Sequence, residues 1–483
     1  MRITVQNRTA RTSPRRRKLK IALGIIAGLV LAHSVAVLIL GHMVESRIMA
    51  YKAQGLPVSA KELAGPPIPD SENGGVLFAQ IFDKVTNVQK IICSRWKASE
   101  ELTPNTRTRY NCSSFAGKLI TANANDAEMN DPNVLSAARA YTVPVRELLP
   151  QIEEAAAKPK CRYKANWQDG RSTLLPYIPG ASVTGRSLAI MAALNAHDGN
   201  MKEAVRALQA VSKIEQSLKE EPTLIGLLVR SRLIYYTFQG LQHAAQYGTI
   251  DKDQAFELYS ALGRSDLKSH NKIALDGERV LGISSFDEIQ RISMSLGSNS
   301  GSIMKDFFYG RILPSYFWRP FLYADELQYF HLTDSSALMS NWREIRASTL
   351  NKTQSSIIEN LPTYAVLTTI LWPEESVAVQ KRDEGIAEAY GIQVFLALLA
   401  YKDTFGGYPA SLDELRSKLG WKLQADPFSG KDFVYKRKGN GFLLYSIGPN
   451  LRDDGGIKDR PREVLLQKAG SEPRDDIAWQ MEK

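Results

Sequence analysis

Cysteine is scarce in this chain, with three residues among 483, and no two of them form a C-x-x-C pair. This argues against a zinc site, because zinc-binding spacings bring cysteine or histidine ligands in close pairs. In an oxidising compartment the count allows one disulfide bond. We predict that Cys93 pairs with Cys112 across a polar, irregular segment. Pairing of Cys112 with Cys161, and three unpaired thiols, are the alternatives.

Local catalytic motifs are also missing. The sequence has no H-E-x-x-H, no P-loop and no dinucleotide-binding glycine pattern, and Gly297 to Gly301 has Asn299 where a G-x-S-x-G elbow needs serine. The histidines after residue 41 are isolated from one another. His197, for example, ends a predicted helix, where an imidazole complements the helix dipole. We therefore predict that the protein is not an enzyme. A hydrolase whose residues converge only in space is the least favoured alternative.

Net positive charge is small beyond the N-terminal end, because basic and acidic residues nearly balance there. The formal net charge is +10, and the first twenty residues alone hold six arginines and two lysines and no acidic residue, which leaves +2 for the remainder. Nucleic-acid binding needs a basic surface on the folded part of the chain. We therefore expect no nucleic-acid partner.

A long apolar run follows this basic segment. Residues Ile21 to Leu40 are apolar apart from His33 and Ser34, and twenty helical residues at about 1.5 Å each span a hydrocarbon core of about 30 Å. The charges from Arg15 to Lys20 should stay in the cytoplasm. We predict a single-pass signal anchor in a bacterial cytoplasmic (inner) membrane, with the bulk of the chain in the periplasm. A cleaved signal peptide is the alternative, but its apolar region would be too long.

The rest of the chain is too long for one ordinary core, so we expect several domains. Residues 188 to 267 have helical periodicity, with a turn at Asp198 to Asn200 and a helix cap at Asp251. The aromatic residues between 307 and 331 should fill a core between helices, and a ligand groove is the alternative. The expected parts are a basic tail (1–20), the anchor (21–40), a proline-rich connector (41–75), a helical extracytoplasmic domain (76–372) and a C-terminal module (373–483).

The C-terminal module combines two periodicities. Apolar residues three or four apart predict a helix that ends at Gly406 and Gly407, and Ser411 is a candidate N-cap for a short second helix. Two strand-like runs then flank the turn residues that end in Gly439 to Gly441, which predicts a β-hairpin. The fold class is therefore mainly α, a helical bundle or irregular helical array with a small α+β module at the C-terminus.

The order of motifs in this module resembles the C-terminal half of the major pseudopilin of type II secretion systems. The resemblance covers about a fifth of the chain. The chain does not begin with a prepilin leader, so we expect a pseudopilin-like module on another scaffold, as in signal-anchored bacterial proteins of unassigned function. The matching residues are Gly407, Tyr408, Pro409, Asp426, Pro427, Gly430, Tyr435, Tyr445, Ser446, Gly448, Asp475, Asp476, Ile477 and Trp479.

This resemblance implies a Ca²⁺ ion in the terminal loop, held by carboxylates and carbonyl oxygens. An acidic residue of the family is replaced by Asn450, and nearby acidic residues can supply the missing charge. In the alternative interpretation these residues only shape turns. The resemblance also implies an accessory or interaction protein of a type II secretion or pilus-like envelope assembly. The runner-up is a periplasmic ligand-binding helical protein. The candidate ligands are Asn450, Asp453, Asp454, Asp475 and Asp476.

Overall fold

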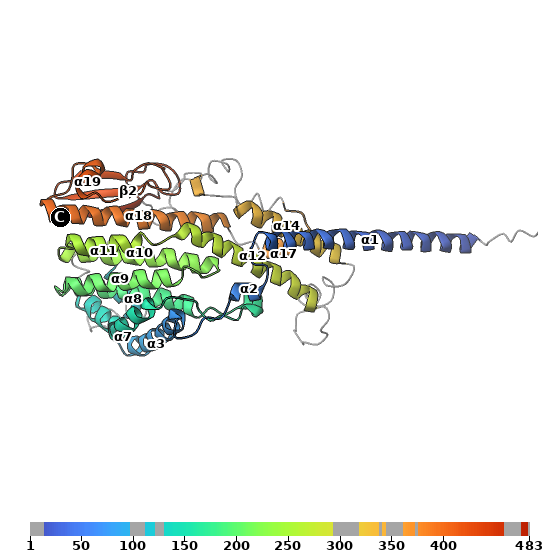
Figure 1. Cartoon of the computed structure of the whole chain (residues 1–483), viewed down its shortest axis with the longest axis horizontal. Coiled ribbons are helices and arrows are strands. Elements are labelled where there is room, and N and C mark those ends of the chain that lie inside the picture. Colours follow the sequence, from blue (N-terminus) through green and yellow to red (C-terminus); the bar gives the residue numbers. More distant parts are fainter. Residues whose placement is uncertain are drawn as a thin grey trace, which may run out of the picture. The chain divides into compact units, whose positions relative to one another are not determined.

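The computed structural model describes residues 14–96, 112–120, 130–292, 318–337, 341–343, 361–371, 375–457 and 475–481. These residues are mainly helical, with one three-stranded antiparallel sheet near the C-terminus, which confirms the predicted fold class (Figure 1). The chain forms two compact units. Unit 1 comprises residues 1–58, 282–333 and 358–372, and unit 2 comprises residues 59–281, 334–357 and 373–483. The domain boundaries expected from the sequence stay a prediction.

Helix α1 (Pro14–Ala53) contains the predicted membrane span. Its large apolar side chains are exposed, among them Leu29, Leu31 and Leu38 at 65, 66 and 71 %. Within the described residues it is the one helix that is long and apolar enough to cross a membrane. The helix continues through Ala53, beyond the predicted membrane span that ends at Leu40, so the first part of the connector is helical.

Unit 1 has its own apolar core. It includes the later part of α1, the end of α12 (Leu267–Ile292), α14 (Arg319–Ala337) and α17 (Val366–Leu371). Phe330 is fully buried and meets the ring of Tyr51 edge-on, with 5.6 Å between ring centroids. Tyr329 and Phe330 thus pack in a core, as predicted for the aromatic segment, whereas Trp318 and Phe321 of the same segment are exposed. The members from Phe307 to Phe317 lie outside the described residues.

Unit 2 begins with helices whose ends match local sequence signals. Asn73 caps α3 and Thr223 caps α10, because the side-chain oxygen of each accepts a hydrogen bond from a backbone N–H group in the first turn. Asp251 forms a capping box with Gln254, as expected at the start of α11. These elements are α2 (Ala60–Ala64), α3 (Gly74–Arg95), α5 (Cys112–Lys118), α7 (Pro132–Ala157), a 3-10 helix (Trp167–Ser172), α8 (Tyr177–His197), α9 (Met201–Ser217), α10 (Leu224–Tyr247) and α11 (Lys252–Leu262).

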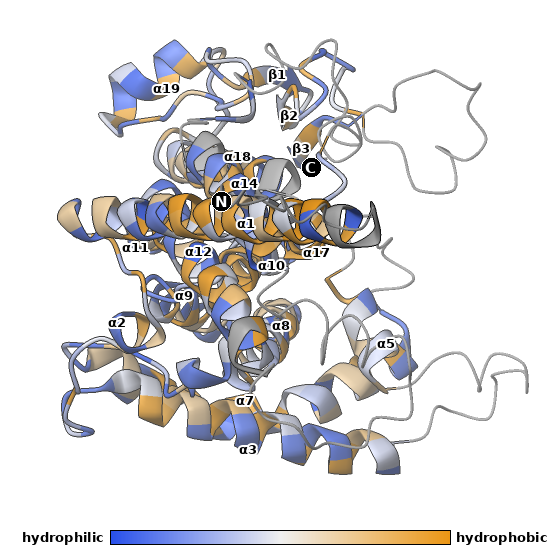
Figure 2. Cartoon of the chain, turned by 90° about the vertical axis from the view of Figure 1, so that its right-hand side faces the viewer, coloured by the Kyte–Doolittle hydropathy of each residue, from blue (hydrophilic) through white to orange (hydrophobic). Residues whose placement is uncertain are grey.

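The helices of unit 2 are stacked in layers (Figure 1). Helices α3 and α7 pack below α8 and α9, and these pack against α10 and α11. Figure 2 shows blue and orange residues mixed along α3, and α3 buries only one side, including Phe78 and Phe82. Helix α18 (Glu375–Phe405) covers α10 and α11, and Phe395 meets Phe238 edge-on at 6.0 Å. One continuous core thus joins the helices to the C-terminal module.

The sheet lies on the other side of α18 from α10 (Figure 1). The strands are β1 (Val434–Lys438), β2 (Gly441–Ser446) and β3 (Ile477–Met481), in the order β1-β2-β3. The central strand β2 is fully buried. Its Leu444 pairs with Trp479 of β3. The hairpin turn is tighter than the predicted loop and has positive φ at Gly439. Ser411 caps the short helix α19 (Leu412–Leu419), as predicted.

Candidate functional site

Asp426 fixes the turn that leads into the sheet. Its buried carboxylate accepts hydrogen bonds from the backbone N–H groups of Phe428 and Ser429, each at 3.1 Å, and from the Ser446 hydroxyl at 2.7 Å. The last contact ties the turn to the end of β2. A carboxylate with several hydrogen-bond donors is stable when buried. Asp426 therefore positions the loop that begins after Ser446.

Strand β3 is held by its tryptophan. Trp479 is fully buried, and its indole N–H donates to the Glu388 carboxylate of α18 at 3.3 Å. A Cβ atom at Gly391 would come within 2.2 Å of the Trp479 ring. Glycine at this helical position therefore lets the indole lie directly against the α18 backbone. The strand in turn brings Asp475 and Asp476 to the loop after β2.

The five predicted ligand residues lie together in this loop. The Asn450 N–H donates to Asp475 Oδ1 at 3.2 Å, and the Asn450 side-chain amide donates to Asp454 Oδ2 at 2.7 Å. The Asp454 N–H donates to Asp476 Oδ2 at 3.1 Å. Asp453 accepts from the Tyr445 hydroxyl at 2.9 Å. The structure thus brings together residues 450–454 and the pair that precedes β3.

Glycine permits the close approach between these two segments. Gly448 has φ of 65°, and a Cβ atom there would lie 2.2 Å from the Asp475 carbonyl oxygen. Gly455 and Gly456 also have positive φ, which glycine adopts at little cost. This backbone turns the Gly456 N–H toward Asp476 Oδ2, at 2.7 Å.

Among the five candidate ligand residues, Asp476 is distinguished by a buried oxygen atom that has no hydrogen-bond partner. Its side chain is 1 % exposed, and its second oxygen, Oδ1, is buried without a hydrogen-bond partner. Burial raises the pKa of Asp476 to about 6, and the carboxylates of Asp454 and Asp453 add to the rise. Two cations lie nearby: the Arg452 guanidinium is 3.5 Å from Asp454 Oδ1, and Lys436 donates to the Tyr445 hydroxyl at 3.0 Å. The loop therefore concentrates negative charge around an oxygen that has a free lone pair.

The oxygen atoms of this loop meet part of what a hard cation such as Ca²⁺ requires. Calcium prefers carboxylate and carbonyl oxygens, and Asp476 Oδ1 is such an oxygen without a donor. Several other carboxylate oxygens accept backbone N–H groups. Across the described ranges, no three aspartate, glutamate, histidine or cysteine side chains are already arranged around one point as metal ligands. A bound Ca²⁺ would draw on Asp476 Oδ1 first, together with Asp453 or Asp454.

Comparisons with known proteins found no match for this chain. No family model matches the chain, and no curated protein and no solved structure matches it.

The two cysteines of the predicted disulfide lie in contact. A hydrogen bond between the thiols lowers the pKa of Cys93 and, together with burial, raises the pKa of Cys112. Cys93 is at the end of α3 and Cys112 begins α5. Cys161 packs elsewhere, against the large core of unit 2, and burial raises its pKa to about 12. All three thiols are free in the structure, and the contact favours Cys93 with Cys112 over the alternative pairing.

Sequence reasoning missed several buried polar groups. Glu215 and Arg230 form an ion pair at 2.7 Å with side chains 2 and 1 % exposed. Glu221 accepts from the Tyr177 hydroxyl at 2.8 Å, and burial raises its pKa to about 7. Nearby, His270 contacts the Glu221 carbonyl oxygen at 2.7 Å, and burial lowers its pKa to about 4. Nothing local in the sequence marks these partners, because each pair joins different elements.

Proposed function

We propose that the protein is a membrane-anchored, extracytoplasmic accessory or interaction protein of the bacterial envelope. Helix α1 supports the anchor, because an exposed row of large apolar side chains over such a length is stable in lipid and not in water. The basic residues before it support a topology with the N-terminus in the cytoplasm and the bulk in the periplasm. The partner would belong to a type II secretion or pilus-like assembly, and the resemblance of the C-terminal module to pseudopilins supports this assignment.

The C-terminal module is the part that we propose to respond to Ca²⁺. The observation that carries this proposal is the buried and unpartnered Asp476 Oδ1 among neighbouring carboxylates. A divalent cation bound there would offset the repulsion between Asp476, Asp454 and Asp453. It would also order residues 450–457, and this loop could then serve as a calcium-dependent docking surface.

Thermal unfolding of the full-length protein in detergent micelles tests the calcium site. We expect Ca²⁺ to raise the melting temperature of the wild-type protein, because a ligand that binds only the folded state stabilises it. Asp476→Asn should remove the effect. Asp413→Asn is the matched control, since its side chain is 89 % exposed on α19, away from the loop. No rise in the wild-type protein, or the same rise in Asp476→Asn, would refute the site.

A second candidate function is ligand binding by the helical part of unit 2. The aromatic segment does not favour it, because Tyr329 and Phe330 are buried in the core of unit 1. The observation that does favour it is a groove between α9 and α11, with a volume of about 340 Å³ and several charged side chains among its lining residues.

A further inference from the structure

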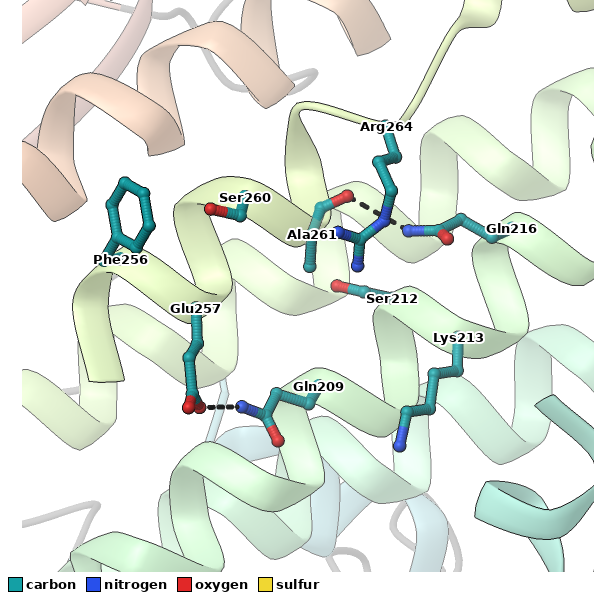
Figure 3. A pocket seen from close by; sticks show the side chains of 9 residues that line it. All are labelled: Gln209, Ser212, Lys213, Gln216, Phe256, Glu257, Ser260, Ala261 and Arg264. Carbon is teal, nitrogen blue, oxygen red and sulfur yellow. Dashed lines mark hydrogen bonds between the residues drawn. The ribbon is translucent and has the colours of Figure 1, made fainter. Parts of the chain in front are cut away.

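The groove lies between the neighbouring helices α9 and α11, and all its lining residues belong to unit 2. Its volume, about 340 Å³, is at the lower end of the range for small-molecule pockets. Four residues come from α9 and four from α11, and Arg264 comes from the turn after α11 (Figure 3). A ligand of this groove must therefore be small. The lining residues are Gln209, Ser212, Lys213, Gln216, Phe256, Glu257, Ser260, Ala261 and Arg264.

Arg264 has a hydrogen-bonded backbone and an exposed side chain. Its N–H donates to the Ala261 carbonyl at 3.2 Å, and the next residue, Ser265, donates its hydroxyl to the buried Glu215 at 2.9 Å. No carboxylate of the described chain forms an ion pair with the Arg264 guanidinium. In Figure 3 the side chain extends from the turn back over the groove toward Ser212 and Gln216. An exposed guanidinium of this kind is suited to a carboxylate.

Ser212 is a second group without a partner. Its side chain is 3 % exposed, and its hydroxyl makes no hydrogen bond within the described structure. Helical serines commonly bond the carbonyl one turn earlier, but Ser212 does not. A buried hydroxyl without a partner lowers stability unless something else supplies one. Ser212 lines the groove beside Arg264, and its hydroxyl, which is covered in this structure, can donate to a ligand oxygen once the covering side chains move aside.

Two further charged residues, Lys213 and Glu257, line the groove. Lys213 is a second cation, and it also helps to lower the pKa of Glu153, which pairs with Arg206 at 2.8 Å. Glu257 is an exposed carboxylate that accepts only from the Gln209 amide, at 2.6 Å. Two cations and one anion therefore face the same small space. The complementary ligand carries two carboxylates and one ammonium group.

We propose that this groove binds a free acidic amino acid. One carboxylate contacts Arg264, Ser212 and Gln216, the other contacts Lys213, and the ammonium group contacts Glu257. This inference goes beyond the proposed calcium-dependent role and does not depend on it, because the groove and the terminal loop share no residue.

Calorimetric titration of the full-length protein in detergent micelles tests the proposal, with L-glutamate as the probe. We expect saturable binding. Glutarate lacks the ammonium group and L-glutamine lacks the second carboxylate, so each should bind more weakly than L-glutamate. No saturable heat with L-glutamate would overturn the proposal. Equal affinity for glutarate would also overturn it, because Glu257 would then make no contribution.

Variants locate the binding to the groove. Arg264→Gln should weaken L-glutamate binding by about tenfold or more, since it removes a charge-assisted hydrogen bond. Ser212→Ala should weaken binding less while leaving the melting temperature of the free protein unchanged or higher. Lys202→Gln removes one positive charge from the exposed face of the same helix α9 and should leave the affinity unchanged. Equal loss in Arg264→Gln and Lys202→Gln would show a non-specific charge effect and would refute the assignment.

Discussion

Asp476 couples protonation to folding in calcium-free protein. Its pKa in the folded state is about 6, above the ordinary value of 3.8. A raised pKa means that the folded state binds the proton more tightly than the unfolded state does. The resulting stabilisation is fully present below pH 3.8 and is lost as the pH rises through about 6. Asp476→Asn removes this titration, so its melting temperature relative to the wild type should rise over the same window.

Circular dichroism melts of both proteins across this window, without divalent cations, measure the effect. Glu221 also has a raised pKa, about 7, but it titrates equally in both proteins. The difference between the two melting temperatures therefore isolates Asp476. A difference that stays constant with pH would contradict the prediction.

The contact between Cys93 and Cys112 leads to a second prediction for single residues. Under oxidising conditions we expect a disulfide between them, and Cys93→Ser should then lower the free energy of unfolding by about 3 kcal/mol. Cys93 is the better position to substitute, because it is only half-buried while Cys112 is fully buried. In the presence of a reductant, Cys93→Ser should lower the free energy of unfolding much less, because the wild-type protein then has no disulfide to lose.

Thiol labelling with mass spectrometry, followed by denaturant unfolding, checks this pairing. Cys161→Ser is the control and should leave the disulfide intact. Labelling of all three cysteines in protein purified from an oxidising compartment would rule the bond out.

At the scale of elements, the junction between α18 and β3 predicts an unusual effect of a small substitution. Gly391→Ala should destabilise the protein by about 1 to 3 kcal/mol, because the new methyl group overlaps the buried Trp479 ring. Helix propensity alone predicts the opposite, since alanine is favoured over glycine by about 1 kcal/mol. Urea unfolding distinguishes the two effects.

Gly407 offers a matched control for this helix. It lies just beyond the end of α18, its φ is not positive, and a Cβ atom there would meet no other atom within 4 Å. Gly407→Ala should therefore be neutral or slightly stabilising. If both substitutions gave the same change in unfolding free energy, the close packing of Trp479 on α18 would be wrong.

Elements with local signals were predictable from the sequence, and the contacts between them were not. Asp251 and Ser411 are adjacent in sequence to the N–H groups that they cap, so their roles could be inferred directly. The requirement for glycine at residue 391 depends on a tryptophan almost ninety positions later. The terminal loop was predicted by resemblance, but the buried and unpartnered Asp476 oxygen arises only when β3 lies beside β2. The Arg264 groove likewise had no sequence signal.

At the scale of the whole molecule, the apolar surface of α1 is the feature that supports the proposed membrane location. Leu29 and Leu31 are near the middle of the predicted span and about two-thirds exposed. Arginine at the centre of a membrane helix disfavours insertion by about 3 kcal/mol per residue. The double substitution Leu29→Arg with Leu31→Arg should therefore shift the protein from the membrane to the soluble or aggregated fraction.

Alkaline extraction of isolated membranes measures this shift. Wild-type protein should stay in the pellet, as an integral membrane protein does, while the double variant is released or fails to reach the membrane. Leu174→Arg is the control, because Leu174 is 82 % exposed in unit 2 and lies outside any predicted span. If the double variant remained in the membrane as firmly as the control, α1 would not be the anchor. The envelope location would then lose its main support, whereas the calcium and amino-acid proposals rest on unit 2 alone and would stand.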